Sequence, residues 1–239
     1  MAIAVDGGHV SRAIDFYNNP SKYFIIGGTK PWADETTPDT PNVKDFRLRD
    51  VIGLKKATNV QLVVPDENGT IQYRTQNWRI VLPEITTRIS SVGVTKNSTV
   101  ISVTSTEGLK AGAKLRVNNL YEGKIVSISG SLITLDTEAP EAIPAGALVL
   151  GGAFVEGAKY VYVETYLEYD RFPIEPTYRQ IGLCTGVTPN DSDTLLAAAY
   201  SPTGTDQFTS LGVLEVLDNR LPASRDINQR EQLSLILEF

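Results

Sequence analysis

The chain has 239 residues, of which 41% are hydrophobic and 21% charged, a balance typical of a folded globular protein rather than a disordered or membrane-spanning one. Its 28 acidic and 22 basic residues give a net charge of −6, which argues against binding to nucleic acid or to an anionic membrane. One cysteine, Cys184, excludes an intrachain disulfide and any multi-cysteine metal site. With His9 as the one histidine, the chain has little of the usual equipment for catalysis, and we expect neither a bound metal nor another cofactor.

The first predicted element is a short helix near the N-terminus. Ser11 is a suitable N-cap, the apolar residues after it have helical spacing, and Pro20 follows the expected end of the helix. His9 precedes this helix in a glycine-containing segment. We therefore interpret His9 as a solvated residue of the N-terminal tail.

A buried strand is predicted next, over residues 23–26. It leads into residues 27–41, which contain three prolines and several acids and are expected to form an irregular surface loop. Trp32 lies on this loop. Two roles stay open for Trp32, either an anchor packed against the rest of the chain or a residue of an interface.

A hairpin is predicted around Asn68-Gly69, a dipeptide typical of tight turns. It lies between the apolar runs at residues 60–64 and 71–74, which are expected to pair. Residues 66–70 look superficially like a calcium loop but have no downstream glutamate at the required distance.

Residues 93–153 differ in composition from the rest of the chain. They are rich in Val, Ile, Leu, Thr and Ser and carry equal numbers of acids and bases, so the net charge lies elsewhere. Short strands separated by turns are predicted at residues 99–104, 114–117, 124–129, 132–135 and 147–150. The fold class is therefore mainly β, with a β-sandwich-like host domain (residues 1–92 and 154–239, with one or two short helices) and an inserted small antiparallel β-barrel or sandwich module (residues 93–153).

The C-terminal residues 231–239 are predicted to form a strand with one apolar face, on which Leu233, Leu235, Leu237 and Phe239 alternate with other residues. Residues 180–184 and 213–217 are its expected neighbours in a sheet. Cys184 lies in the first of these runs and is expected to be a small buried hydrophobe.

A further strand pattern places aromatic and acidic side chains on one face, namely Tyr160, Tyr162, Glu164, Tyr166, Glu168 and Asp170. This face is interpreted as a polar surface or subunit contact. Carbohydrate binding is an alternative. A carboxylate glycoside hydrolase using Glu164 and Glu168 ranks last, because residues four apart on a strand are separated by about 13 Å, more than hydrolases use.

Four segments, taken in order, resemble a known family, the baseplate wedge subunit conventionally numbered eight of T-even-like contractile-tailed bacteriophages. The segments are Phe16-Tyr17-Asn18; Phe24-Ile25-Ile26-Gly27 followed by Pro31-Trp32; Phe172-Pro173 with Tyr178-Arg179-Gln180-Ile181; and Asn219-Arg220-Leu221-Pro222 before the terminal strand. We name Pro31, Trp32, Tyr178, Arg179, Gln180, Asn219, Arg220 and Pro222 the signature residues.

The resemblance implies a structural virion protein rather than an enzyme, assembled in the host cytoplasm into the tail baseplate. It implies a homodimer that contacts other wedge proteins, with tail-fibre attachment proteins as further partners, and helps couple baseplate rearrangement to sheath contraction. The candidate contact elements are Trp32, the strand face from Tyr160 to Glu168, and residues 190–207. The alternative function is a tail module that binds host-surface carbohydrate.

Overall fold

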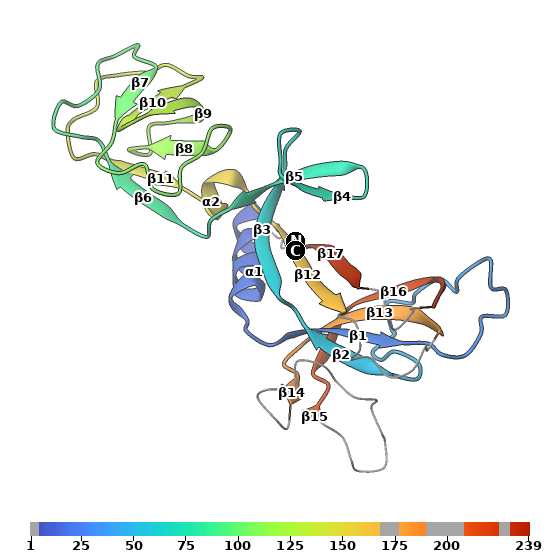
Figure 1. Ribbon diagram of the computed structural model, residues 1–239. Helices are drawn as coiled ribbons and strands as arrows, with labels where there is room; N and C mark the ends of the chain where they lie inside the picture. The colour runs from blue at the N-terminus through green and yellow to red at the C-terminus, as the bar shows by residue number, and fades with distance from the viewer. Residues whose placement is uncertain (1–4, 168–176, 190–207, 225–229) are drawn as a thin grey trace. The chain divides into compact units, whose positions relative to one another are not determined.

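The computed structural model describes residues 5–167, 177–189, 208–224 and 230–239, and it is mainly β as predicted (Figure 1). The chain forms two compact units. The first unit comprises Met1–Tyr17, Gln61–Val161 and Glu238–Phe239, and the second comprises Asn18–Val60 and Tyr162–Leu237. Within the described residues, neither helix has the length and apolar character needed to cross a membrane.

Helix α1 (Asp6–Asn18) ends before Pro20 as predicted but begins earlier than expected, so the assignment of His9 to a tail is wrong. His9 lies inside the helix, where its Nδ1 is 3.2 Å from Arg12 Nη2. Asp6 occupies the first turn, where a carboxylate favours the helix N-terminus. On the buried face, the Phe16 ring packs against Phe239, with ring centroids 5.0 Å apart.

Six strands of the first unit form one antiparallel sheet (Figure 1). In spatial order they are β6 (Ile85–Arg88), β11 (Leu148–Gly151), β8 (Lys114–Val117), β9 (Tyr121–Ser129), β10 (Leu132–Leu135) and β7 (Val100–Ser102). An Ile89–Val103 bridge joins the two outer strands, and Thr104 N–H donates to the Arg88 carbonyl at 2.9 Å. The sheet is therefore a nearly closed small barrel, which leaves little free strand edge.

The barrel has a hydrophobic core of its own, built from alternate residues of each strand, including Ile101, Leu115 and Ile133. All five strands predicted in this region are present, and Asn118 and Asn119 adopt positive φ in the β8–β9 turn. The barrel also includes β6, which precedes residue 93. The boundaries 93 and 153 of an inserted module stay a prediction.

The hairpin predicted at Asn68-Gly69 is wrong. β3 (Asn59–Pro65) pairs with β5 (Gln76–Val81), and β4 (Ile71–Tyr73) pairs with the other edge of β5. Asn68-Gly69 does form a turn, but this turn crosses over β5, and a Cβ at Gly69 would lie 2.2 Å from the Trp78 backbone. The tight hairpin is instead the one between β4 and β5.

The second unit contains a four-stranded sheet. Its order is β16 (Val213–Ser224), β13 (Thr177–Thr185), β1 (Lys22–Gly27) and β2 (Gly53–Lys56). Cys184 is buried in this sheet as predicted, and burial raises the pKa of its thiol to about 12. Two further short strands, β14 (Thr188–Pro189) and β15 (Phe208–Ser210), pair with each other in a separate antiparallel sheet.

The terminal strand β17 (Glu231–Glu238) has the predicted apolar face, since Leu233, Leu235 and Leu237 are buried. Its predicted neighbours are wrong. β17 belongs to a five-stranded sheet of order β17-β12-β3-β5-β4, where β12 is Tyr160–Leu167. β13 could not pair with it, because β1 and β16 occupy both edges of β13.

Candidate functional site

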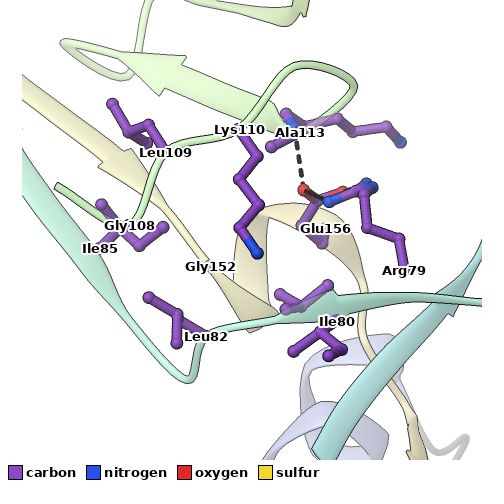
Figure 2. Close-up of a pocket in the computed structure, with 12 residues that line it drawn as sticks. Arg79, Ile80, Leu82, Ile85, Gly108, Leu109, Lys110, Ala113, Gly152 and Glu156 are labelled. Atoms are coloured by element: carbon purple, nitrogen blue, oxygen red, sulfur yellow. Dashed lines mark hydrogen bonds and ion pairs between the residues drawn. The ribbon is translucent and has the colours of Figure 1, made fainter. Parts of the chain in front are cut away.

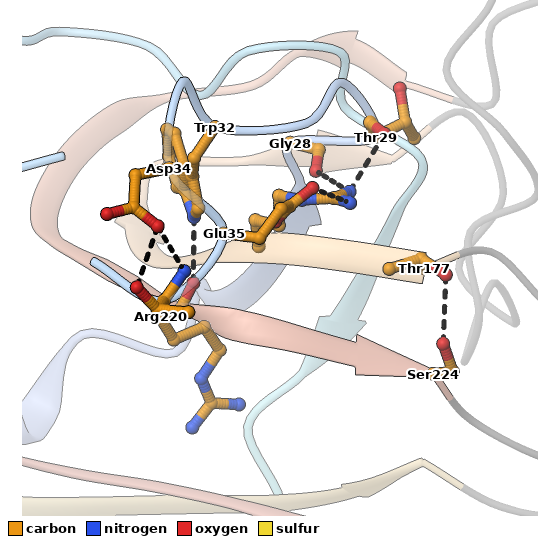
Figure 3. Close-up of polar contacts among 10 residues, drawn as sticks. Gly28, Thr29, Trp32, Asp34, Glu35, Thr177, Arg220 and Ser224 are labelled. Atoms are coloured by element: carbon orange, nitrogen blue, oxygen red, sulfur yellow. Dashed lines mark hydrogen bonds and ion pairs between the residues drawn. The ribbon is translucent and has the colours of Figure 1, made fainter. Parts of the chain in front are cut away.

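Among the described residues of the second unit, the longest irregular segment lies between β1 and β2, residues 28–52, and we name it the arm. In Figure 1 it is the blue trace that extends past β13 and β16. Trp32 is 5% exposed, and its Nε1 donates to the Arg220 carbonyl oxygen at 3.0 Å (Figure 3). Trp32 is thus an anchor within the chain, whereas its role in an interface stays a prediction. Leu48 is buried at the other end of the arm.

Arg179 fastens the first half of the arm to β13. Its Nη2 donates to Glu35 Oε1 at 2.7 Å, its Nε donates to Glu35 Oε2 at 2.9 Å, and its Nη1 donates to the Thr29 carbonyl at 2.9 Å (Figure 3). The hydrogen bonds from Arg179 hold the pKa of Glu35 below its ordinary value. One buried arginine therefore fixes both a side chain and the backbone of the arm.

Two signature amides fasten the second half. Gln180 Oε1 accepts from the Arg49 backbone N–H at 2.7 Å, and Gln180 Nε2 donates to Asn219 Oδ1 at 2.8 Å. Asn219 Nδ2 in turn donates to the Asp39 carbonyl at 2.7 Å. These hydrogen bonds connect Gln180 on β13 to Asn219 on β16 and both residues to the backbone of the arm. In each of the two side-chain amides, both the oxygen and the nitrogen are therefore hydrogen-bonded.

The other signature residues lie around this network. Tyr178 is buried, donates its hydroxyl hydrogen bond to Glu231, and has a pKa raised by burial and by that carboxylate. Pro222 lies where the β13–β16 register shifts, a position at which a missing N–H is tolerated. Pro31 is exposed beside Trp32.

The tip of the arm, residues 42–47, exposes two apolar side chains. Val43 is fully exposed and Phe46 is 75% exposed. The turn that carries them is held by its own polar groups, since Asp45 Oδ2 accepts from Asn42 N–H at 2.9 Å and Asn42 Oδ1 accepts from Lys44 N–H at 2.9 Å. The arm thus presents two hydrophobic side chains on an ordered turn.

The tyrosine face predicted on β12 is partly covered. Tyr162 and Glu164 are buried, and Tyr160 and Tyr166 are half-buried. In the first unit, Tyr160 packs edge-on against Trp78 with centroids 5.0 Å apart. Glu168, Asp170, Phe172-Pro173 and residues 190–207 lie outside the described residues. The use of this face as an interface stays a prediction that rests on Tyr160 and Tyr166.

Glu164 does not present a free carboxylate. Its Oε2 accepts from Asn59 Nδ2 at 3.1 Å and its Oε1 accepts from Gln232 Nε2 at 2.6 Å. These bonds satisfy a buried charge and tie together three strands of the second unit. In the described part of the chain, no three His, Cys, Asp or Glu side chains are grouped as metal ligands would be.

An ion-pair cluster of the first unit joins β5, the short helix α2 (Ala153–Glu156) and the barrel. Arg79 donates from Nη1 and Nη2 to the two oxygens of Glu156 at 2.9 and 3.0 Å, and from Nε to Asp66 Oδ2 at 2.7 Å. Glu156 also accepts from the Lys114 backbone N–H at 3.0 Å. A cavity of about 90 Å³, lined in part by Leu82, lies beside the cluster (Figure 2).

The Arg79–Asp66 pair predicts a specific response to acid. The hydrogen bond from Arg79 and that from the Asn68 backbone hold the pKa of Asp66 below its ordinary value. The stabilisation is therefore complete above the unfolded-state pKa of about 4 and is lost as the pH falls through the lower folded-state pKa. In urea unfolding, we expect the free energy of unfolding of the wild type to exceed that of Asp66→Asn by about 1.5–3 kcal/mol near neutral pH. This difference should shrink below about pH 4. Exposed Asp15→Asn is the control, and a pH-independent Asp66→Asn difference would contradict the assignment.

A family model described as "Baseplate wedge 3 tail fiber network component" matches residues 1–95 and 133–239. The chain belongs to this family. "Virion protein 3" of Enterococcus phage phiEF24C is 32% identical over 111 residues, which cover 36% of this chain. The alignment spans 60% of that relative's length.

Membership of this family makes the chain a structural component of a phage baseplate, and the similar protein is a phage virion protein. The matched residues include the whole arm and every signature residue. The unmatched residues, 96–132, lie within the barrel.

Sequence reasoning missed several residues of the arm in this baseplate protein. The loop was predicted to end at residue 41, whereas the irregular segment continues to residue 52. Val43 and Phe46 were therefore not predicted as contact residues. Two apolar residues in a charged stretch that lacks strand alternation could have indicated an exposed contact. Nothing in the sequence pairs Glu35 with Arg179, because 144 positions separate them.

Loss of the hydrogen bonds from Arg179 to Glu35 and Thr29 is expected to loosen the arm without unfolding the sheet. Trypsin can cut after Lys44 or Arg47 when the arm opens locally, and the cleavage rate follows the population of the open form. Arg179→Met should raise that rate about tenfold, the factor for a lost charge-assisted clamp. Peptide mass spectrometry of timed digests measures it, with exposed Arg12→Met as the control. An unchanged rate in Arg179→Met would show that Arg179 does not hold the arm.

Proposed function

We propose that this chain is a wedge subunit that joins neighbouring baseplate proteins to one another and to the tail-fibre network, in the position that subunit eight has in T-even-like baseplates. The observation that carries the proposal is a set of hydrogen bonds that fixes the arm to β13 and β16. The residues that form it are Trp32, Arg179, Gln180, Asn219 and Arg220. These residues come from distant parts of the sequence, and their shared effect is to fix one projecting segment.

The arrangement suits an assembly protein. A segment that is ordered before binding loses little conformational entropy when it meets a partner, so more of its contact energy appears as affinity. The described residues that carry polar chemistry, such as Glu164 and Arg79, are engaged in holding the fold together. Their engagement supports contact, rather than turnover, as the work of the chain.

Two further parts of the proposal concern assembly. The chain acts as a homodimer and helps couple baseplate rearrangement to sheath contraction. Residues 93–153 form a module inserted in the wedge-type host domain, a division supported by the separate barrel core and by the gap at residues 96–132 in the family match.

Disruption of the gene tests the function directly. A nonsense mutation in the phage that encodes this chain should give particles with defective baseplates and uncontracted or unattached sheaths, visible by electron microscopy. Expression of the wild-type chain in the host should restore them. Normal, contractile tails that lack the chain would overturn the proposal.

The homodimer is tested on the purified chain. Sedimentation equilibrium should give a mass about twice the 26.1 kDa of one chain at micromolar concentration. A mass of one chain across that range would remove the dimer from the proposal and leave the wedge role to the genetic test.

A further inference from the structure

We infer that the tip of the arm docks into an apolar pocket rimmed by carboxylates on a different protein of the virion. The inference rests on the proposed function, because it assumes that the chain works by contacting other baseplate proteins. It adds which residues make one contact and what the partner's surface must offer.

The tip has the composition of an interface anchor. Phe46 and Val43 lie on the same turn and are the two most exposed large hydrophobic residues of the second unit's arm. Aromatic side chains that enter a pocket on a partner commonly dominate the affinity of an interface. Because the turn is held by Asn42 and Asp45, the position of Phe46 is fixed before binding.

The charge around Phe46 selects the partner. Lys44 and Arg47 are exposed, and neither forms an ion pair within the part of the chain that the structure describes. Arg47 instead lies 5.5 Å from the centre of the Phe46 ring. The one acid between them, Asp45, accepts the Asn42 N–H. The tip is therefore basic on a chain of net charge −6, and it complements an acidic rim.

Three cavities lined by described residues of the first unit do not fit the tip. The apolar cavity beside Leu82 measures about 90 Å³, smaller than the about 150 Å³ that holds a benzene ring, and Lys110 and Lys114 line it with charge of the same sign as the tip. Two larger hollows of the first unit, about 480 and 380 Å³, are lined mainly by polar residues such as Glu67 and Gln72. None of these three cavities combines an apolar interior large enough for an aromatic ring with an acidic rim, so the inference assigns the pocket to another protein and leaves a second copy as an outcome of the test.

Photocrosslinking in the assembled particle tests the inference. Phage that carry Phe46→p-benzoylphenylalanine are purified, irradiated and digested, and crosslinked peptides are identified by mass spectrometry. We expect one other virion protein, crosslinked next to apolar residues with Asp or Glu nearby. A crosslink to a second copy of this chain, or a yield no higher than that of the exposed control Val92→p-benzoylphenylalanine, would overturn the inference.

Incorporation into particles gives a second readout. In cells that express wild-type and variant chains together, Phe46→Ala and the double variant Lys44→Glu/Arg47→Glu should each enter virions about tenfold less than wild type, and Val92→Ala should enter equally. Equal entry of Phe46→Ala would overturn the inference even if the photoprobe failed to assemble. Absence of the wild-type chain from virions would instead overturn the proposed function.

Discussion

Deletion of residues 235–239 is expected to leave the chain insoluble and absent from particles. Leu235 and Leu237 are buried in the second unit, and the Phe239 ring packs on Phe16 in the first. Each large apolar side chain removed from the core costs about 1.5–3 kcal/mol. The two buried leucines, together with the half-buried Phe239, therefore account for a large part of the about 5–15 kcal/mol that stabilises a typical domain. The deletion also exposes the edge of β12, which invites aggregation.

The soluble fraction after expression and the thermal midpoint of any soluble protein measure this effect. Glu238→Gln is the matched control within the same strand, because it removes the exposed ion pair with Lys159 while its amide oxygen can still accept from the Tyr160 hydroxyl, and it should change stability by less than about 1 kcal/mol. A truncated chain that stays soluble with an unchanged midpoint would show that β17 is not part of the core.

Arg79→Met should destabilise the first unit by about 3–5 kcal/mol. The side chains of Arg79 and Glu156 are 15% and 4% exposed. Methionine keeps much of the alkyl volume but removes the cation from Glu156 and Asp66, so two largely buried carboxylates keep only their backbone hydrogen-bond donors. The cost comes from those unpaired charges rather than from lost packing.

The two tryptophans allow this effect to be located. Trp78 lies in the first unit and Trp32 in the second. In denaturant unfolding, a Trp32→Phe background reports on the first unit, and there Arg79→Met should lower the midpoint strongly. Arg116→Met, which breaks an ion pair whose side chains are 41% and 46% exposed, should cost less than about 1 kcal/mol. Similar effects of the two substitutions would mean that the Arg79 cluster is solvated.

Strands and turns of the chain could be predicted well because their signals are local. The alternation of Leu233, Leu235 and Leu237 correctly predicts a strand with one buried face. The Asn118-Asn119 turn follows from the tolerance of asparagine for positive φ. The start of α1 was missed because Gly7 and Gly8 are poor helix formers, yet the surrounding helix includes them.

Pairing could not be predicted with the same success. β3 and β4 both match the pattern of a hairpin around Asn68-Gly69, but each pairs with β5 instead. The register of a turn depends on a few residues, whereas the partner of a strand depends on which apolar face the whole unit buries. Only the folded unit decides that.

The candidate site shows the same division. The amino-acid sequence by itself determined a β-rich protein with little catalytic equipment, and its signature residues led to the baseplate family. The tertiary structure alone decided which side chains hold the arm in place, namely Trp32, Arg179, Gln180 and Asn219. It also decided that Phe46 lies at the tip of this fixed arm. Periodicity and turn chemistry act over a few residues, but a hydrogen bond between Arg179 and Glu35 exists only after folding has brought two distant segments within 3 Å of each other.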